Sequence, residues 1–600
     1  MDLKLNTSVA SIEERRAVDN VLGTSPLFTG GEPRTADELR TARAGESLRQ
    51  LRHQLLPVLH ALNDQVGWIS RGAINYIAQR LDIAPAEIYG VASFYALFSM
   101  TERPRRQIHV CIDLACRAAG GYKEHDLPLG THASPCLGAC ERAPATLVIE
   151  AGDSPRHELQ APSSRLEIDA LVGGAWPSEE KPVSTAVPQL GRHDESLVLL
   201  RRIGSVDSTS IAAYQTHGGF EALNKALTMG AAQVVAEITT AGLVGRGGAA
   251  FPTGRKWAAV AQQSVQPHFL VCNADESEPG TFKDRVLLEG DPFALVESMT
   301  IAGFATGCTK GWVYLRGEYP RAWRALHHAI DVARQNGFLG ENILDSGYSF
   351  DIEIIRGAGA YICGEETAIF NSIEGYRGEP RNKPPFPVEV GLFGKPTLVN
   401  NVETLVNVLP IIQLGGDAYS DLGTEGSRGR KLFCVSGAVA EPGVYEVEFG
   451  TTLRQLLDLA GGMRQGSSLR AILLGGAAGG FVGPDDLEMP LTLEGTRAAG
   501  STLGSGVVLV LDSTVDMIDQ LQRIAAFFRD ESCGQCVPCR VGTVRQQEVI
   551  SRLSRGVDDN DLELLRELGQ VMRDASICGL GQTANSAIAS AISNLGVFAS

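Results

Sequence analysis

The residues best suited to chemistry in this chain are its cysteines. Twelve cysteines occur in 600 residues, and eight of them follow spacings typical of metal or cluster ligands. Three thiolates at C-x2-C-x2-C with a fourth from a distant segment fit a [4Fe–4S] cluster, whereas zinc more usually takes its ligands two and two. The C-terminal set has this cluster pattern and consists of Cys533, Cys536, Cys539 and the distant Cys578.

The other four clustered cysteines form two close pairs. They are Cys111-x4-Cys116 and Cys136-x3-Cys140. Such pairs on short turns can hold a two-iron [2Fe–2S] cluster, but four thiolates also suit structural zinc, and the spacing does not distinguish the two. The remaining cysteines are isolated, and we expect them to be buried as small hydrophobic side chains: Cys272, Cys308, Cys363 and Cys434.

A glycine-rich stretch over residues 245–257 is the second chemical feature. Glycines at 245, 247, 248 and 254 let the backbone approach a ligand closely, because no Cβ stands in the way. Exposed N–H groups at such a turn, followed by a helix start, attract phosphate. Positive charge comes from Arg246, Arg255 and Lys256, and flat apolar faces on which a ring can stack come from Phe251 and Trp257. An ordinary glycine-rich turn is the alternative.

Polar side chains crowd the end of a predicted strand over residues 268–272. The strand runs into residues 273–280, Asn-Ala-Asp-Glu-Ser-Glu-Pro-Gly. In an open α/β sheet, ligands bind at the carboxyl ends of the strands. Carboxylates beside a phosphate loop would repel a dianion, so we expect Asp275, Glu276 and Glu278 to reach neutral ring or sugar groups. A solvated acidic loop is the alternative.

A second strand is predicted over residues 350–355. It runs into another glycine-containing segment, residues 357–367, in which two adjacent glutamates directly follow a glycine. Further on, paired prolines stiffen a loop that presents Phe386. A predicted helix start near residue 400 supplies hydrogen-bonding side chains from Asn400, Asn401 and Thr404.

Six hundred residues are too many for one hydrophobic core, so several domains are expected. Helical periodicity, a proline-rich stretch and short apolar runs between turns mark the divisions. We predict a multidomain α/β chain: a loosely ordered leader over 1–45, a helical bundle and a cysteine-bearing domain over 46–173, a linker over 174–195, an α/β domain over 196–429, a β-grasp-like domain over 430–515 and a helical domain over 516–600.

Composition excludes several classes of function. A net charge of −17 argues against nucleic acid as the main partner, because binding to a phosphate backbone needs a basic face. The chain has no apolar run long enough for a transmembrane helix and no secretory signal at its N-terminus. We therefore expect a cytoplasmic protein without direct membrane insertion.

Taken together, the motifs resemble a known family. The glycine-rich loop, the 273–280 segment, residues 364–366 with 400–401, and the C-terminal cysteines are similar to the NADH-oxidising flavoprotein subunit of respiratory complex I, over roughly residues 196–600. Residues 46–173 resemble the thioredoxin-like [2Fe–2S] subunit of the same machinery, which favours iron–sulfur over zinc at the first cysteine set. The fusion resembles diaphorase chains of soluble NAD-linked enzymes, and residues 572–582 look most like the β subunit of molybdenum or tungsten formate dehydrogenases.

The resemblance implies a set of cofactor contacts. FMN would be held by Gly245, Gly247, Lys256, Asn273, Asp275, Asn400, Asn401 and Thr404. The nicotinamide nucleotide site would be lined by Phe251, Glu276, Glu278, Glu366 and Phe386. The same cofactor site would include Arg246, Gly248, Ser277, Tyr361, Gly364 and Glu365. Cys111, Cys116, Cys136 and Cys140 would ligate [2Fe–2S], and the C-terminal four would ligate [4Fe–4S].

Two departures from the family pattern matter. Only nineteen residues separate Cys116 from Cys136, fewer than is usual, so a strand–helix unit is expected to be missing from that sheet. Trp257 is followed by two alanines where relatives often carry an aromatic residue that covers the nucleotide, which predicts weaker nucleotide binding.

The expected chemistry is reversible hydride transfer between NAD(H) and FMN. A hydride carries two electrons and a cluster takes one, so the flavin serves as converter, and the protein mainly positions the reactants. Lys256 and Glu276 are the candidate catalytic residues, with Lys256 stabilising the reduced flavin. We predict a diaphorase subunit that exchanges electrons with a partner subunit carrying a molybdenum, tungsten or nickel–iron site and further clusters. Formate dehydrogenase is the first expectation, with the flavin subunit of NAD-reducing hydrogenase, a non-enzymatic relay or a complex I component as alternatives.

Overall fold

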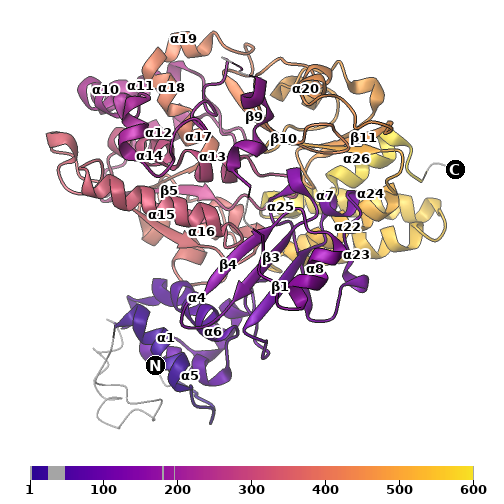
Figure 1. The fold of residues 1–600 in the computed structure, drawn as a ribbon, viewed down its shortest axis with the longest axis horizontal. Coiled ribbons are helices and arrows are strands. Elements are labelled where there is room, and N and C mark those ends of the chain that lie inside the picture. The colour runs from indigo at the N-terminus through magenta and orange to yellow at the C-terminus, as the bar shows by residue number, and fades with distance from the viewer. Residues whose placement is uncertain (1–2, 24–47, 179–180, 193, 195, 599–600) are drawn as a thin grey trace.

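The computed structural model describes residues 3–23, 48–178, 181–192, 194 and 196–598. Within them the chain forms an N-terminal helical bundle, three separate sheets and a C-terminal group of helices (Figure 1). This mixed helix and sheet content confirms the multidomain α/β prediction.

The N-terminal bundle has four α-helices among the described residues: α1 (Ile12–Leu22), α4 (Leu55–Val66), α5 (Arg71–Leu81) and α6 (Pro85–Ala92). Ser70 caps α5 by accepting a hydrogen bond from Ala73 N at 3.0 Å, and Pro85 begins α6, both at positions where the sequence favours a helix start. The leader differs from its prediction, because residues 12–22 form α1, which a Ser11–Glu14 capping box starts and which packs on α4. The rest of that leader, from residue 24, lies outside the described residues.

A four-stranded sheet follows the bundle, in the order β2-β1-β3-β4. Its elements are β1 (Arg106–Cys111), α7 (Leu114–Ala118), β2 (Thr131–Ser134), β3 (Thr146–Glu150), β4 (Arg156–Gln160) and α8 (Arg165–Val172). β1 pairs in parallel with β2 and antiparallel with β3. The short interval between the cysteine pairs therefore still contains an edge strand, and the two pairs follow the ends of the parallel strands β1 and β2.

The largest domain is built on a parallel sheet in the order β7-β6-β5-β8. The strands are β5 (His268–Ala274), β6 (Cys308–Leu315), β7 (Asp351–Arg356) and β8 (Thr397–Asn401). The helices are α9 (Ile211–Thr216), α10 (Glu221–Met229), α11 (Ala231–Thr240), α12 (Thr253–Ala261), α13 (Lys283–Gly290), α14 (Pro292–Thr306), α15 (Pro320–Gln335), α16 (Glu366–Ile373), α17 (Val402–Val406), α18 (Val408–Leu414) and α19 (Gly416–Ser420).

The strand order of this sheet creates a switch point. From β5 the chain steps to β6 and β7 on one side, and β8 then returns to the other side of β5. Asn273 at the end of β5 stands beside Asn401 at the end of β8. The polar ends of both strands therefore meet at the crevice where open α/β sheets bind ligands.

The β-grasp-like prediction is confirmed by a five-stranded mixed sheet, β10-β9-β13-β11-β12, with a helix across it. Its elements are β9 (Arg430–Gly437), β10 (Gly443–Glu448), α20 (Leu453–Leu459), β11 (Leu469–Leu474), β12 (Gly480–Val482), α21 (Leu493–Ala498) and β13 (Val507–Asp512). Thr452 caps α20 by accepting from Gln455 N. This domain has its own apolar core, separate from the main one.

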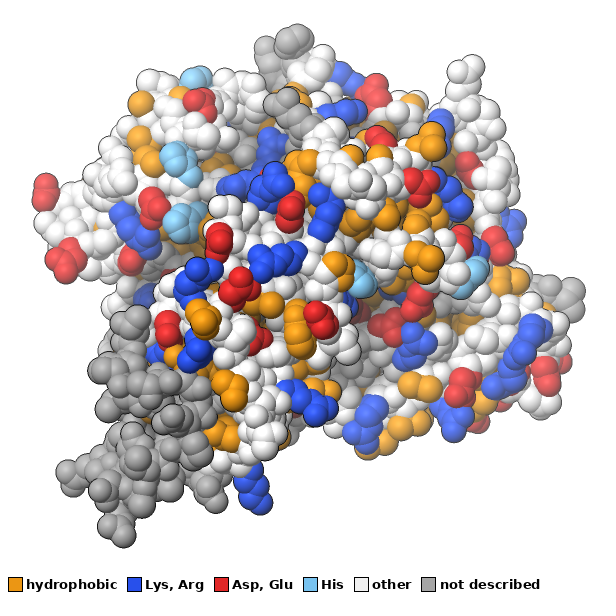
Figure 2. Space-filling model, turned by 60° about the horizontal axis from the view of Figure 1, so that its bottom comes forward, with side chains coloured by type: hydrophobic (Ala, Val, Ile, Leu, Met, Phe, Trp, Pro, Cys, Tyr) orange, Lys and Arg blue, Asp and Glu red, His pale blue; other side chains and the backbone are white. Residues whose placement is uncertain are grey.

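The chain ends in helices: α22 (Met517–Glu531), α23 (Val537–Leu553), α24 (Asp559–Ala575), α25 (Gly579–Thr583) and α26 (Ser586–Leu595). α26 packs against β12 of the β-grasp-like domain, and α22 contacts α7 of the first cysteine domain, so the C-terminal helices join parts that are far apart in sequence (Figure 1). Among the described residues, no helix is both long and apolar enough to cross a bilayer. On the face in Figure 2, acidic and basic side chains are intermixed.

Candidate functional site

A cavity of about 390 Å³ lies at the switch point of the parallel sheet. This volume falls in the range of roughly 300–1,000 Å³ typical of small-molecule sites. Eleven of the nineteen predicted cofactor-site residues line it: Gly247, Gly248, Asn273, Asp275, Glu276, Ser277, Glu278, Tyr361, Gly364, Glu365 and Asn401. The structure thus brings together residues from four segments that are well separated along the chain.

The glycine-rich loop forms one wall. Gly245 N donates to Phe251 O at 2.9 Å, which closes the loop before α12 begins. A Cβ on Gly247 would lie 3.0 Å from the Asn401 Cβ, and Gly248 has φ 125°, so both positions favour glycine. The loop can therefore present its backbone to the cavity, in agreement with the sequence prediction.

The Arg246 side chain of this loop points away from the cavity. Arg246 is 1% exposed, and its Nη2 donates to Arg428 O at 2.7 Å. Its backbone N donates to Thr404 Oγ1 at 2.8 Å, so the Thr404 hydroxyl supports the loop from behind. The expectation that the Arg246 side chain adds charge at a phosphate is wrong, because the guanidinium is enclosed by protein.

Trp257 is also turned inward. It is fully buried, and its Nε1 donates to Asn400 Oδ1 at 2.9 Å. The expectation that Trp257 offers a stacking face is wrong, and Asn400 is occupied in holding it. Phe251 and Phe386, by contrast, are 48% and 51% exposed, which leaves their ring faces accessible.

The acidic segment after β5 is held in one conformation. Asn273 Nδ2 donates to Gly364 O at 2.8 Å, and Ser277 Oγ donates to Asp275 Oδ2 at 2.6 Å. Burial raises the pKa of Asp275 well above its ordinary range. The structure therefore favours a neutral or proton-sharing carboxyl at Asp275, which suits contact with an uncharged polar group.

Glu276 and Glu278 line the cavity but are already engaged. Glu276 accepts from Asp284 N at 2.8 Å and Arg285 N at 2.9 Å, so its carboxylate caps α13. Tyr361 donates its hydroxyl to Glu278, which also accepts from Ala478 N at 3.0 Å. Burial is the largest cause that raises the pKa of each glutamate to about 7. The catalytic role expected for Glu276 stays a prediction.

Lys256 lies outside the cavity wall in an ion-pair group. Its Nζ is 3.1 Å from Glu366 Oε2, and Lys383 Nζ is 2.8 Å from the other oxygen of Glu366. Lys383 also pairs with Glu365, which caps α16. Despite burial, the two lysines hold the pKa of Glu366 below its usual value. Lys256 therefore acts as one member of a charged group.

Several residues of the cavity wall were not predicted. The β-grasp-like domain contributes Gly475, Ala478, Thr502, Gly504 and Ser505; the C-terminal helices contribute Gly579, Leu580 and Thr583; and Thr281 and Asp284 lie in the same wall. The Ser505 hydroxyl oxygen is buried without a hydrogen-bond partner among the described residues, as a group awaiting a ligand would be. Of these residues, only Thr281 and Asp284 lie close in sequence to the predicted segment 273–280. The other segments are adjacent to it only in space.

A buried charge group supports this wall. Lys283 Nζ is 2.7 Å from Asp284 Oδ1 and 3.1 Å from Glu403 Oε2, and Lys431 Nζ is 2.7 Å from the same Glu403 oxygen. Asn401 Nδ2 donates to Asp284 Oδ2 at 2.6 Å. Asn401 is thereby oriented at the cavity edge by residues that sequence analysis did not single out. The donors, acceptors and glycines of this cavity fit FMN.

The four cysteines of the first set lie close together in the structure, and their role as cluster ligands stays a prediction. Cys111 ends β1, Cys116 lies on α7, and the other two lie on the loop between β2 and β3. The sulfurs of Cys136 and Cys140 are 3.4 Å apart, and the Cys111 thiol contacts those of Cys116 and Cys136. All four are buried, which gives a donor set that fits a [2Fe–2S] cluster.

The C-terminal cysteines gather at helix starts. Cys536 precedes α23, Cys539 lies in its first turn, and Cys578 precedes α25. Burial raises the pKa of the Cys539 thiol to about 12 and that of Cys578 to about 11, so both are protonated at neutral pH unless a metal ion binds them. Cys578 directly precedes Gly579 and Leu580 of the cavity wall. The four isolated cysteines are buried, as expected.

Fold and site together fit a flavin and iron–sulfur protein, with the predicted cluster ligand Cys578 next to the wall of the switch-point cavity. Family models agree: the Nuo51 FMN-binding domain matches residues 238–410, the NADH-ubiquinone oxidoreductase-F iron-sulfur binding region residues 519–596, the thioredoxin-like [2Fe-2S] ferredoxin residues 42–127, and the SLBB domain residues 432–484. The ferredoxin match, which includes Cys111 and Cys116, favours iron–sulfur over zinc at the first cysteine set.

Similar proteins give the same assignment. The HndC subunit of the NADP-reducing hydrogenase of Solidesulfovibrio fructosivorans is 45% identical over 64% of this chain and 79% of its own length. The F subunit of the NADH-quinone oxidoreductase of Aquifex aeolicus is 43% identical over 66% of this chain and 92% of its own. An NAD⁺-reducing [NiFe]-hydrogenase structure covers 91% of this chain and 92% of that one, with a TM-score of 0.74 and 32% identity.

The chain belongs to the family of F-type flavoprotein subunits of NADH-quinone oxidoreductases. It is a subunit of an NAD-linked oxidoreductase, and its cofactors are FMN, [2Fe–2S] and [4Fe–4S].

Proposed function

We propose that the cavity at the switch point binds FMN and that the chain carries out reversible electron exchange between NAD(H) and its iron–sulfur clusters. When bound, FMN accepts a two-electron hydride and passes electrons on singly. The observation that carries this proposal is the wall formed by Gly579 and Leu580 directly after Cys578, because it brings a cluster ligand to the edge of the flavin site.

The chain's own residues bind and orient the reactants. Backbone N–H groups at Gly247 and Gly248 face a phosphate, and Asn273 and Asn401 supply fixed hydrogen-bonding groups at the strand ends. The exposed ring of Phe251 stacks on the nucleotide. Hydride transfer needs no acid or base, so positioning is the main contribution of the protein.

Lys256 places a fixed positive charge beside the flavin. Its ammonium is 3.1 Å from Glu366 and also donates to Val399 O at 3.2 Å, so it is held against β8. The second oxygen of Glu366 is shared with Lys383, which leaves Lys256 only partly neutralised by its partner. A fixed cation at this edge of the cavity stabilises the added negative charge of the reduced flavin.

We place the chain with a catalytic partner subunit of the formate dehydrogenase class. The supporting feature is the segment around Cys578, residues 572–582, and its likeness to the β subunits of those enzymes. The second candidate is a hydrogenase partner, which the likeness to an NAD⁺-reducing [NiFe]-hydrogenase over 91% of the chain supports. Metal analysis of the natively purified complex separates them: molybdenum or tungsten supports the first, and nickel without either supports the second.

The diaphorase activity has its own test. Anaerobic NADH should bleach the visible flavin spectrum of the purified protein and produce the spectra of reduced clusters. A flavin that stays oxidised under NADH would contradict the proposal and indicate a relay that has lost nucleotide binding.

A further inference from the structure

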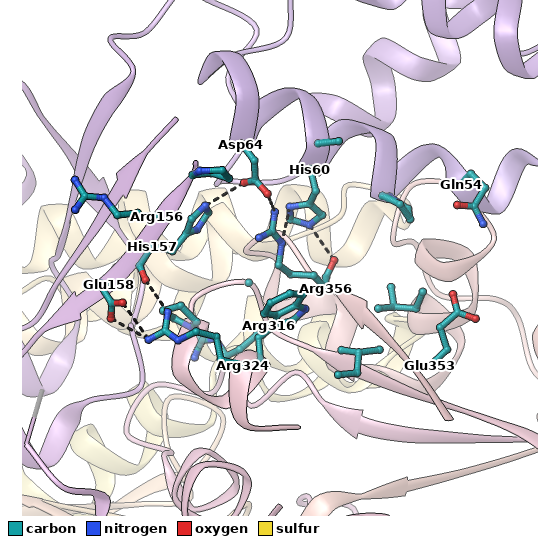
Figure 3. A pocket seen from close by; sticks show the side chains of 18 residues that line it. Gln54, His60, Asp64, Arg156, His157, Glu158, Arg316, Arg324, Glu353 and Arg356 are labelled. Carbon is teal, nitrogen blue, oxygen red and sulfur yellow. Dashed lines mark hydrogen bonds and ion pairs between the residues drawn. The ribbon is translucent and has the colours of Figure 1, made fainter. Parts of the chain in front are cut away.

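Arg316 connects the two sites around which the chain is built. It follows β6 and lines a cavity of about 870 Å³ between the N-terminal module and the α/β domain (Figure 3). Other charged residues at this cavity make ion pairs across it: Arg356 pairs with Asp64 at 2.7 Å, and Arg324 with Glu158 at 3.0 Å. Arg316 is different, because it is 3% exposed and its guanidinium reaches toward the cysteine loop.

The Arg316 guanidinium holds two peptides at once. Its Nη2 donates to Cys136 O at 2.5 Å, and its Nη1 donates to Glu276 O at 2.8 Å. Glu318 pairs with Nη2 at 2.9 Å and helps to fix the guanidinium. A planar guanidinium with fixed donors transmits a shift of one partner to the other more directly than a flexible ammonium. The peptide of a cluster cysteine is thus tied to the peptide of a cavity residue.

Two neighbouring residues make the same connection independently. Tyr319 donates its hydroxyl to Glu276 Oε2 at 3.1 Å, and a Cβ on Gly138 would lie 2.1 Å from that hydroxyl, so the Tyr319 ring rests on the cysteine loop. Arg285 donates from its backbone to Glu276 Oε2 at 2.9 Å and from Nε to Gly138 O at 2.8 Å. Three residues therefore join Glu276 to the loop that carries Cys136 and Cys140.

We propose that Arg316 is a positioning residue that couples nucleotide binding at Glu276 to the reduction potential of the [2Fe–2S] site at Cys136. A reduced cluster carries one more negative charge, and a buried cation beside a ligand peptide stabilises that state. When a nucleotide moves the Glu276 peptide, the Arg316 guanidinium moves with it. This changes both the positive charge and the hydrogen bond at Cys136. This inference rests on the proposed function, since it takes the four cysteines as cluster ligands and the cavity as the flavin and nucleotide site.

The test is a redox titration of the whole complex, with the [2Fe–2S] cluster followed by electron paramagnetic resonance, in the absence and presence of NAD⁺. The variants are Arg316→Gln and Arg316→Lys. Arg316→Gln removes the charge and the planar guanidinium, whereas Arg316→Lys keeps the charge but not the guanidinium geometry. Arg324→Gln is the matched control. Arg324 also joins the α/β domain to the cysteine domain (Figure 3), but among the described residues its hydrogen bonds go to His157 O and Glu158 of β4 and not to the cysteine loop.

Wild type should show an NAD⁺-dependent shift in the potential of this cluster. Arg316→Gln should lower the potential, so that the oxidised-to-reduced ratio at a fixed potential rises at least tenfold, which is about 59 mV for a one-electron couple. Arg316→Lys should keep a potential near that of wild type but lose the NAD⁺-dependent shift. Arg324→Gln should behave as wild type in both titrations.

Three results would overturn the inference. One is a wild-type cluster whose potential does not respond to NAD⁺, and another is an NAD⁺ response that survives in Arg316→Lys. If Arg316→Gln fails to assemble the cluster, Arg316→Lys alone decides. The third result is a wild-type complex that has no [2Fe–2S] signal or whose flavin does not respond to NADH. It would contradict the proposed function itself, and the coupling with it.

Discussion

Replacing Asp113 by alanine should loosen the first cysteine domain from the C-terminal helices. Asp113 is buried and makes contacts in three directions. One carboxylate oxygen accepts from Leu114 N at 2.9 Å and caps α7, and the other accepts from Cys136 N at 3.2 Å. Arg523 of α22 pairs with that same carboxylate at 3.3 Å, and its side chain is 5% exposed.

The size of the effect follows from these contacts. Loss of a helix cap costs about 1 kcal/mol, and removal of one partner from a buried ion pair costs about 3–5 kcal/mol because the other charge stays buried. Arg523 keeps only a longer contact, 3.8 Å, to Asp530. The sum, about 4–6 kcal/mol, is a large share of the roughly 5–15 kcal/mol that stabilises a typical domain. With a urea slope of about 2 kcal/mol/M, the unfolding midpoint of this domain should fall by about 2–3 M.

The assay is urea unfolding with two signals recorded in parallel: visible circular dichroism of the [2Fe–2S] cluster and fluorescence of released FMN. The cluster signal should be lost at lower urea in Asp113→Ala, while the flavin signal shifts less. Asp519→Ala is the control, because Asp519 joins the same two parts through Arg117 at 3.0 Å and Lys123 at 2.8 Å. Lys123 is 43% exposed, and Arg117 keeps a hydrogen bond from its Nε to Ile112 O at 2.9 Å, so neither cation is left buried and unpaired and we expect a cost of about 1 kcal/mol there. Equal midpoints for the two variants would refute the reasoning.

Three further predictions follow, two on residues near the cavity and one on a buried glutamate of the β-grasp-like domain. Lys256→Ala should slow NADH oxidation, because it removes the positive charge proposed to stabilise the reduced flavin. FMN should stay bound, because Lys256 pairs with Glu366 outside the cavity wall. Unchanged turnover would contradict this. Phe251→Ala should raise KM for NADH with little change in melting temperature. Trp257→Phe should instead cost about 1–3 kcal/mol of stability, because it leaves a buried acceptor, Asn400 Oδ1, unpaired. A reversed pattern would argue against the two assigned positions. Glu446 is buried and its pKa is raised from 4.5 to about 7, so the stability it contributes is full below pH 4.5 and is lost as the pH rises through 7, a change of about 3 kcal/mol. Melting curves of Glu446→Gln at pH 5 and pH 8 should therefore differ less than those of wild type.

Features that depend on neighbouring residues were predictable from the sequence. The strand over residues 268–272 appears as expected, the cysteine spacings indicated the ligand groups, and Ser70 and Thr452 cap helices, as serine and threonine commonly do. Each depends on chemistry within a few residues: a thiolate pattern, a side-chain oxygen before a helix, or an apolar run before polar residues. The polar groups at the end of β5 were also predictable, but strand β8, which places Asn401 beside Asn273, was not predicted.

Side-chain direction was not predictable where packing decides it. Arg246 and Trp257 stand within the same stretch as Phe251, yet the first two are buried and the third is exposed. No local pattern separates them, because the difference arises from Asn400 and Arg428, which reach the loop from distant parts of the chain. Helix α1 is a different case, because Ser11 and Glu14 form a capping box at its start, a local signal that the sequence does carry.

By itself, then, the sequence determined which chemical groups the protein carries and the local turns that present them, because spacing and backbone preference act over a few residues. The tertiary structure alone decided that Ser505 and Gly579 complete the wall of the switch-point cavity and that Arg316 ties Cys136 to Glu276. Such contacts depend on how domains that are distant in sequence pack against one another. That packing is the sum of many side-chain contacts, so no short stretch of sequence can predict it.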